Sequence, residues 1–211
     1  HYGNKTGQSL TVRFRTADLS PDLRLHLPEF VGTYSAYAPA RLFAAYVNVN
    51  RVDLKLYRLT PEEVLSQTRD WYDYTPPASQ LARQWSQNLE ASLNTASYAA
   101  IDAGGGGKPL APGAYLLIAT SPQLKDNRYG LRHLMMVSKL NLTLKASQHG
   151  ALVWATDLNS GQPVPNLAVT LYGYQGGNLG AAKTGADGVA GFDVDGTRSE
   201  RAEYGDAVLS S

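Results

Sequence analysis

The chain has 211 residues, of which 43% are hydrophobic, and a net charge of +1 at pH 7. This length allows one large domain or two modules of roughly 100 residues each, and the hydrophobic content excludes disorder for most of the chain. With 19 basic and 18 acidic residues, it has no strong field of either sign, which argues against nucleic acid and anionic membrane surfaces as partners. The absence of Cys excludes disulfides, thiolate metal ligands and a cysteine nucleophile.

No apolar run approaches the roughly 20 residues that a membrane-spanning helix needs; the longest are short stretches such as residues 134–137. No signal peptide opens the chain, and residues 1–7 lead directly into a strand pattern. We therefore expect a portion of a longer polypeptide, without a membrane-spanning segment in this portion.

Strand patterns dominate the sequence. The 13 Tyr, 20 Gly and 11 Pro residues are typical of strands and turns, and turns such as Asp187–Gly188 recur at the spacing of about 8–12 residues that a β-sandwich shows. Residues 116–118 and 152–154 are apolar throughout and suit central strands. The pattern predicts an all-β protein of tandem antiparallel β-sandwich domains, the first with a partly helical insertion. Four segments alternate with a period of two: residues 10–15, 52–56, 140–145 and 169–172.

Residues 61–103 are the predicted insertion. Thr60 and Glu63 can form a capping box around a Pro at the first helical position. Further on, apolar residues recur every four positions, which predicts a helix with one apolar stripe. We expect helices at residues 61–68 and 79–93, with the stripe packed on a sandwich face. The stripe consists of Leu81, Trp85, Leu89 and Leu93.

The insertion ends at Gly104–Gly107, which invites comparison with a phosphate-binding loop. That motif requires Gly where Asp102 stands and Ser or Thr where Pro109 stands. The sequence therefore favours a flexible linker over a phosphate site.

The titratable residues form no recognisable catalytic or metal motif. Asp70 and Asp73 flank Trp71 and Tyr72, which suggests a sugar-cleaving pair or a carbohydrate platform; a solvated link between the two predicted helices is the preferred interpretation. No Gly-x-Ser-x-Gly elbow is present, and no His has a second His or a carboxylate at metal-ligand spacing. No catalytic, cofactor-binding or metal-binding residue is therefore assigned, and no cofactor is expected. The histidines are His1, His26, His133 and His149.

Two weaker patterns concern modification and calcium. Asn4 and Asn141 each begin an Asn-x-Thr glycosylation pattern, but both lie in probable strands. The segments Asp157–Asn159 and Asp193–Asp195 could contribute to a calcium site between modules. Turn capping is the preferred role, because Asp and Asn readily bond to their own backbone.

An ordered series of motifs fills the last third of the chain, at residues 142–145, 151–158, 160–165, 168–172 and 184–192. Its prolines stand where no ladder hydrogen bond is donated, and its Asp-Gly pair suits a tight turn between paired strands. This series resembles the macroglobulin domain of the bacterial alpha-2-macroglobulin family.

Two upstream regions extend this resemblance. Residues 46–59 and 110–117 resemble the preceding macroglobulin domain of the same family, and residues 2–16 resemble the last hairpin of a bacterial immunoglobulin-like module. The expected organisation has three parts. Residues 1–19 are the terminal strands of a preceding immunoglobulin-like module, and residues 20–137 are a macroglobulin-like β-sandwich with the insertion. Residues 138–211 are a second macroglobulin-like β-sandwich, short enough to be truncated by its last strand.

The resemblance implies a non-catalytic structural module of a broad-spectrum endopeptidase inhibitor that traps proteinases. Such a protein would be exported to the bacterial periplasm, the cell surface or the extracellular space. The partners would be neighbouring domains of the full-length chain, and proteinases only in the context of the whole protein. Many family members tether the proteinase through a Cys–Gln thioester, which cannot lie in this Cys-free sequence. No bait region is evident, although residues 104–108 would make an easily cut loop.

Two other classes of function are compatible with these patterns. The chain could be an immunoglobulin-like stalk or adhesin module of a bacterial surface protein, in which Trp71, Tyr72 and Tyr74 contact a sugar or a protein. It could also be an accessory domain of a secreted hydrolase whose active site lies elsewhere. The flanking sequence would discriminate between them: a thioester motif indicates the inhibitor, a cell-wall sorting signal the adhesin, and a catalytic motif the hydrolase.

Overall fold

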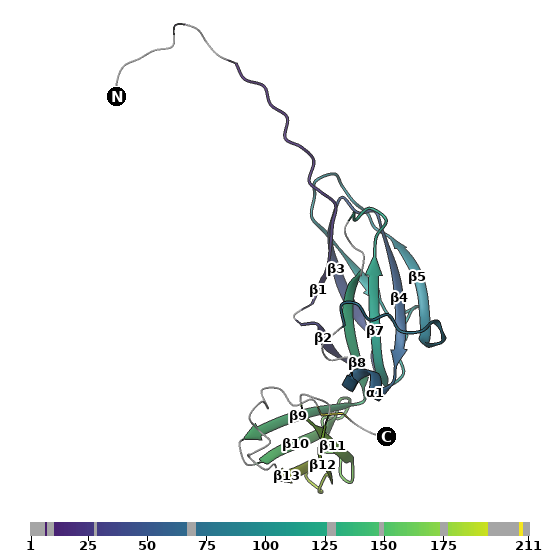
Figure 1. Ribbon diagram of the computed structural model, residues 1–211, viewed down its shortest axis with the longest axis vertical. Helices are drawn as coiled ribbons and strands as arrows, with labels where there is room; N and C mark the ends of the chain where they lie inside the picture. Colours follow the sequence, from purple (N-terminus) through teal and green to yellow (C-terminus); the bar gives the residue numbers. More distant parts are fainter. Residues whose placement is uncertain are drawn as a thin grey trace.

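The computed structural model describes residues 7, 11–27, 29–66, 71–125, 130–147, 150–173, 177–193 and 207–208, and strands make up nearly all of its regular structure (Figure 1). The prediction of an all-β fold is confirmed. The elements of the first part are β1 (Asp22–His26), β2 (Val31–Ser35), β3 (Arg41–Val47), β4 (Arg51–Leu59), α1 (Pro61–Ser66), the 3₁₀ turn η1 (Ala78–Gln80), β5 (Leu81–Asn88), β6 (Ser97–Asp102), β7 (Gly113–Thr120) and β8 (Leu131–Ser138). Those of the second part are β9 (Leu140–Ser147), β10 (Gly150–Asp157), β11 (Ala168–Tyr172), β12 (Asn178–Lys183), β13 (Val189–Asp193) and β14 (Ala207–Val208).

Strands β1 to β8 form the first sandwich. A three-stranded sheet of order β1-β3-β6 faces a five-stranded sheet of order β2-β8-β7-β4-β5. Alternating side chains of both sheets meet between them: Leu42 and Ile101 come from the smaller sheet, Leu54 and Leu117 from the larger, and each is at most 2% exposed. Burial of this apolar surface is the main stabilising contribution to the sandwich.

One pairing departs from the predicted antiparallel arrangement. Strand β2 lies parallel to β8, with Val31 opposite Leu134 and Ser35 opposite Ser138. Strand β1 ends at His26 in the smaller sheet and β2 begins at Val31 in the larger one, so the chain changes sheets between these two strands. The sandwich is thus mixed at one edge of its larger sheet.

The predicted helix at residues 79–93 is wrong, and residues 61–103 are not an insertion. Strand β5 occupies most of the predicted helix and pairs along β4, while β6 is an integral strand of the smaller sheet. Spacings of four residues are multiples of two, so the apolar stripe also suits one face of a strand. Leu89 is buried, Leu81 and Trp85 are half-buried, and Leu93 is 68% exposed, contrary to expectation.

Two polar side chains explain why β5 resembles a helix in sequence. Arg83 and Gln87 stand between the apolar residues on the inward face, where a strand pattern would predict apolar residues. Arg83 donates hydrogen bonds to the carbonyls of Asp102 and Ala103, at 2.7 and 3.1 Å. Gln87 donates to the carbonyl of Ala100 at 3.0 Å. These bonds compensate for placing polar groups on the inward face.

The outer face of the five-stranded sheet is covered by the connection between β4 and β5. The predicted first helix is confirmed as α1, and residues 67–68 of its predicted range lie outside the described residues. The capping box is present: the Thr60 amide donates to Glu63 Oε2 at 2.7 Å, and the Glu63 amide to Thr60 Oγ1 at 3.3 Å. Val64 and Trp71 of this connection pack on the sheet around Leu116.

Strands β9 to β14 form the second, smaller sandwich. Sheet β13-β10-β9 faces sheet β12-β11-β14. The alternation noted in residues 140–145 and 169–172 is realised in β9 and β11. Its core joins both sheets and consists of Ala151, Val153, Val169, Leu171, Ala190 and Phe192.

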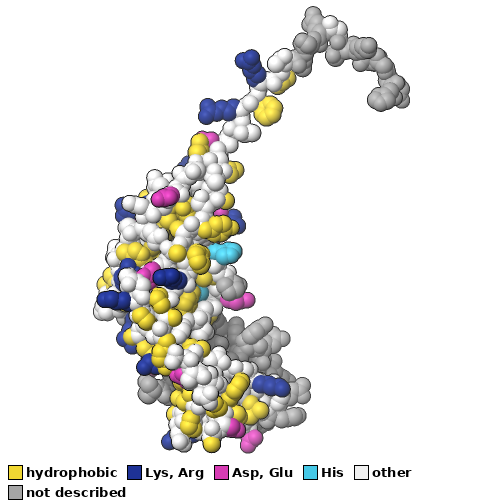
Figure 2. Space-filling view, turned by 180° about the vertical axis from the view of Figure 1, so that it is seen from behind, with side chains coloured by type: hydrophobic (Ala, Val, Ile, Leu, Met, Phe, Trp, Pro, Cys, Tyr) yellow, Lys and Arg dark blue, Asp and Glu magenta, His cyan; other side chains and the backbone are white. Residues whose placement is uncertain are grey.

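Two surface features bear on function. Lys and Arg side chains are interspersed with Asp and Glu on the face that Figure 2 shows, as the net charge of +1 leads one to expect. Residues 11–20 are exposed and form a narrow extended segment that leads away from the first sandwich (Figure 1).

Candidate functional site

The best defined candidate site is the junction between the two sandwiches. Only Lys139 separates β8 from β9. The carbonyl of Ser138 accepts a 2.8 Å hydrogen bond from the Ala36 amide, after β2 in the first sandwich. The carbonyl of Lys139 accepts a 2.8 Å bond from the Leu158 amide, after β10 in the second. Each sandwich therefore restrains one peptide of the connection.

A side-chain bond crosses the junction directly. Tyr37, in the loop after β2, donates its hydroxyl to Asp157 Oδ2 at 2.7 Å, and the Lys139 ammonium lies 5.8 Å from the centre of the Tyr37 ring. The hydrogen bond from Tyr37, with others from Ser160 and Asn159, lowers the pKa of Asp157 to about 2. The same bond is the main cause that raises the pKa of Tyr37.

The other oxygen of Asp157 caps the following turn. Its Oδ1 accepts from the amides of Asn159 and Ser160, at 3.0 and 2.8 Å. This is the turn-capping role preferred from the sequence. Asp195 of the alternative calcium site lies outside the described residues, and within the described ranges no three His, Asp or Glu side chains are grouped closely enough to hold a metal ion.

The backbone amides of the glycine loop are hydrogen-bonded to a carboxylate of the chain itself. Asp102 Oδ1 accepts from the Gly105 amide at 3.1 Å, and Oδ2 accepts from the Gly107 amide at 2.6 Å. These bonds, that from Gly107 first, lower the pKa of Asp102. Because this side chain takes the amides that an anion would use, the loop has the geometry of a closed turn. It is thus neither the predicted flexible linker nor a phosphate site.

The aromatic residues around position 72 do not form an exposed platform. Trp71 is buried and packs against Phe30 and Tyr74, with ring centroids 6.1 and 5.9 Å apart. Of the three residues suggested for contact with a sugar or a protein, Trp71, Tyr72 and Tyr74, only Tyr72 is strongly exposed. Asp70 lies outside the described residues, and the second helix that would flank this link is absent.

The described histidines have structural surroundings. His133 is 1% exposed; its Nδ1 lies 2.8 Å from the Phe30 carbonyl and its Nε2 lies 2.7 Å from the Tyr34 hydroxyl. A neutral ring that donates from Nδ1 and accepts at Nε2 satisfies both contacts. His26 is exposed and packs edge-on against Tyr98. His1 and His149 lie outside the described residues.

The glycosylation patterns give no further site. Asn141 is exposed on β9, and its amide lies within 3.4 Å of Thr143 Oγ1. Asn4 lies outside the described residues. A strand is a poor context for this modification, which favours surface loops.

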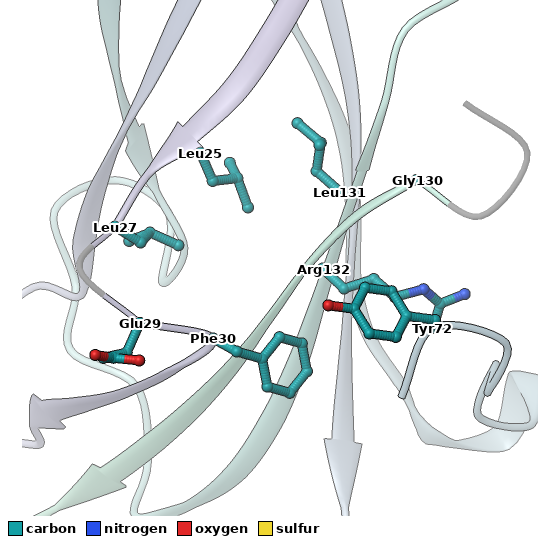
Figure 3. Close-up of a pocket in the computed structure, with 8 residues that line it drawn as sticks. All are labelled: Leu25, Leu27, Glu29, Phe30, Tyr72, Gly130, Leu131 and Arg132. Atoms are coloured by element: carbon teal, nitrogen blue, oxygen red, sulfur yellow. The ribbon is translucent and has the colours of Figure 1, made fainter. Parts of the chain in front are cut away.

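A shallow hollow of about 270 Å³ opens where the chain passes from β1 to β2 (Figure 3). Leucine and aromatic side chains make up most of its lining, and Glu29 and Arg132 are the charged residues among the lining residues. The hollow is lined by Leu25, Leu27, Glu29, Phe30, Tyr72, Gly130, Leu131 and Arg132.

In the described part of the chain, no helix is long and apolar enough to cross a membrane.

Sequence reasoning placed the junction between sandwiches near residues 137–140, but it missed the residues that hold it. Tyr37 lies 120 positions from Asp157, and no local pattern marks either residue as a contact. The aromatic residue among Ala and Pro of residues 36–40 is the only signal, and it does not identify a partner.

Comparison with known proteins agrees with the family resemblance. Residues 137–210 match the family model of the bacterial alpha-2-macroglobulin MG3 domain. This part of the chain is therefore similar to a macroglobulin domain of the bacterial alpha-2-macroglobulin family, as its motifs predicted. No curated protein sequence matches the chain.

Solved structures extend the likeness to the first sandwich. Native alpha-2-macroglobulin from Escherichia coli spanning domains MG0-NIE-MG1 has a TM-score of 0.72 at 17% identity, with 94% of this chain and 66% of that chain covered. The span NIE-MG1 of the same protein has 0.61 at 18%, covering 85% and 90%. A mutant of Salmonella alpha-2-macroglobulin has 0.65 at 17%, covering 86% and only 11%. At these identities the likeness shows a shared fold.

Proposed function

We propose, from the premise that residues 137–210 are a bacterial macroglobulin domain, that the chain is a non-catalytic structural module of a protein that traps endopeptidases. The observation that carries the proposal is the family match of these residues. The tandem fold shared with Escherichia coli alpha-2-macroglobulin supports it over 94% of the chain. The chain covers 11% of the Salmonella protein, so trapping would be a property of a much larger assembly of domains.

The proposed organisation keeps three parts. Residues 20–137 and 138–211 are two macroglobulin-like sandwiches, in accordance with their separate hydrophobic cores. Residues 1–19 are terminal strands of a preceding immunoglobulin-like module. The described end of this segment supports that view, because Val12 and Phe14 are 69% and 85% exposed on an extended backbone. Alternating apolar side chains of this kind are suited to complete another sheet.

In this proposal the module contributes rigidity and spacing. Its cores are close-packed and deform little, and both peptides of the connection are hydrogen-bonded. Movement of a trap around a proteinase would then occur as rigid bodies about residues 137–140. The partners are neighbouring domains of the same long chain, and a proteinase only through the whole protein.

The family implies an exported protein of the bacterial periplasm, cell surface or extracellular space. A chain without Cys is compatible with such compartments and carries no thioester of its own. Any covalent tether to a proteinase would lie in another domain of the full-length protein.

The test compares the 211-residue chain with the full-length protein that contains it. Both are incubated with several endopeptidases, and cleavage of a large protein substrate is measured. The chain alone should leave the substrate unprotected and hydrolyse no ester or glycoside above background, whereas the full-length protein should protect it. Stoichiometric protection by the chain alone, or no protection by the full-length protein, would contradict the proposal.

The adhesin alternative loses its main support in the structure. The aromatic residues proposed for contact include Trp71, which is 7% exposed, and half-buried Tyr74, whose hydroxyl donates to Glu63. A single exposed Tyr72 makes a weak sugar platform. The hydrolase accessory domain remains the second candidate. Esterase and glycosidase assays on the full-length protein would favour it if they showed hydrolysis above background.

A further inference from the structure

Two asparagine side chains form hydrogen bonds with the main chain where residues 11–19 join the first sandwich. Asn94 Oδ1 accepts a 2.8 Å hydrogen bond from the Leu19 amide, and Asn48 Nδ2 donates a 2.7 Å bond to the Leu19 carbonyl. The two side-chain amides thereby bind both backbone groups of one residue, as a neighbouring strand would. Asn48 lies between β3 and β4, and Asn94 lies between β5 and β6.

The two asparagines also bind each other. Asn48 Nδ2 donates to Asn94 Oδ1 at 3.1 Å, and the Asn94 amide donates to Asn48 Oδ1 at 2.7 Å. A further bond joins Asn94 Nδ2 to Asp18 Oδ1 at 3.1 Å. This set of bonds around Leu19 is called the asparagine clasp below. Its five bonds share four residues, so loss of one side chain breaks several of them.

The backbone at both asparagines is in the left-handed region, with φ of 52° at Asn48 and 59° at Asn94. Asn tolerates this region better than most residues, and Gly tolerates it best. The backbone conformation at Asn48 and at Asn94 therefore helps to set the direction of each side chain in the clasp.

The core of the sandwich anchors one half of the clasp. Val49, next to Asn48, is fully buried. Gln123 donates to the Asn48 carbonyl at 3.2 Å and accepts from the Asn50 amide at 2.8 Å. The loop that carries Asn48 is thus bonded on both sides of a buried side chain.

We infer that the asparagine clasp fixes the direction in which residues 11–18 leave the first sandwich, so that they form a presented strand with a constant orientation. Figure 2 shows basic side chains on one side of this segment and hydrophobic ones on the other. A fixed direction would hold Val12 and Phe14 in one orientation toward the preceding module that the proposed function assigns to residues 1–19. The inference deepens the proposed function, in which residues 1–19 belong to a preceding module, but its test requires only this chain.

The experiment measures distances by pulsed electron paramagnetic resonance. The chain has no Cys, so Arg13→Cys and Lys55→Cys give two labels, one on the exposed segment and one at an exposed position of β4. Asn48→Gly and Asn94→Gly, combined, remove the side-chain amides and keep a backbone that adopts positive φ without strain. Asn166→Gly is the matched control, because Asn166 has φ of 58° but lies in the second part of the chain.

The expected result is one narrow distance distribution in the parent and in Asn166→Gly, and a broad distribution in the double variant. Circular dichroism should show the same strand content and a retained cooperative transition in all three. A broad distribution in the parent, or one that stays narrow in the double variant, would overturn the inference. Neither result bears on whether the full-length protein traps proteinases, so the two proposals fail independently.

Discussion

The hydroxyl of Tyr37 lies 2.7 Å from Oδ2 of Asp157, and this one contact joins the loop after β2 to the end of β10. The same carboxylate uses its second oxygen to cap the turn at residues 159–160. The orientation of the two sandwiches is therefore linked to the conformation of a turn in the second one.

Replacing Tyr37 with Phe should loosen this link and leave both cores intact. The ring is retained, and only the hydrogen bond between the sandwiches is lost. Small-angle scattering should show a wider range of overall dimensions, and Tm should change little because the bond is exposed. Tyr72→Phe, at an exposed tyrosine, serves as the control. Identical scattering from parent and Tyr37→Phe would show that the backbone bonds alone set the orientation.

Acid should destabilise the first sandwich through His133. Burial lowers the pKa of this ring in the folded state, against the effect of its bond to Phe30. The folded state then binds the proton less well than the unfolded chain, whose His titrates near about 6.5. The free energy of unfolding should fall as pH drops from about 7.5 toward 5. Carboxylates with lowered pKa, such as Asp157, lose their contribution only at lower pH.

Urea titrations across this range would measure the effect. His133→Gln should be less stable at pH 7.5 and should lose most of the slope between pH 7.5 and 5. His26→Gln, at an exposed ring, is the control for replacing a His by Gln. An unchanged slope in His133→Gln would assign the acid sensitivity to other groups.

Arg83→Ala should destabilise the chain by about 1–3 kcal/mol, because the carbonyls of Asp102 and Ala103 lose a donor. Its guanidinium carbon also lies 4.1 Å from the centre of the Trp85 ring, so the packing of that ring changes too. Gln84→Ala, on the exposed face of the same strand, should stay within about 0.5 kcal/mol of the parent. Chemical denaturation gives both values. If Arg83→Ala were as stable as the parent, water would have replaced the lost hydrogen-bond donor.

Trp85→Ala should cost less than the roughly 3–5 kcal/mol expected for a fully buried ring, because the side chain is only half-buried on a strand. Leu54→Ala, at a fully buried position of β4, provides the comparison and should cost about 2–5 kcal/mol. A larger loss for Trp85→Ala than for Leu54→Ala would show that the ring closes more of the core than its exposure indicates.

Asp102→Ala should convert the glycine loop into a protease-sensitive site. Without the carboxylate, the amides of Gly105 and Gly107 lose their acceptor. Cleavage within residues 103–108 by subtilisin, a protease of broad specificity, followed by mass spectrometry, should become much faster than in the parent. Asp22→Ala, which removes an exposed partner of Arg24, should not accelerate cleavage within this loop. Equal rates in Asp102→Ala and parent would mean that the turn closes without its carboxylate.

The strands that could be predicted from sequence are those with a clean two-residue period. Residues 52–56 and 140–145 alternate without exception and lie in β4 and β9. Strand β5 could not be recognised in this way, because its inward face includes Arg83 and Gln87. Their partners are carbonyls of β6 and of the residue after it, which become neighbours only once the sandwich has formed.

The candidate sites were less predictable than the fold. Turn capping by Asp157 follows from local preference and was predicted correctly. The clasp and the junction depend on pairs such as Leu19 with Asn94, 75 positions apart, and Tyr37 with Asp157. A single sequence contains no periodicity that reports such pairs.

The covered outer face of the five-stranded sheet makes the first sandwich one-sided. Val64, Trp71 and Tyr74 pack over that face, so a neighbour could reach the sheet around Leu116 only by displacing Trp71. The opposite face, on β1, β3 and β6, has no such cover among the described residues, and Phe43 and Tyr98 are 50% and 65% exposed on it. In a row of such modules, lateral contacts would form on this face, which gives the row a polarity that a symmetric sandwich would lack.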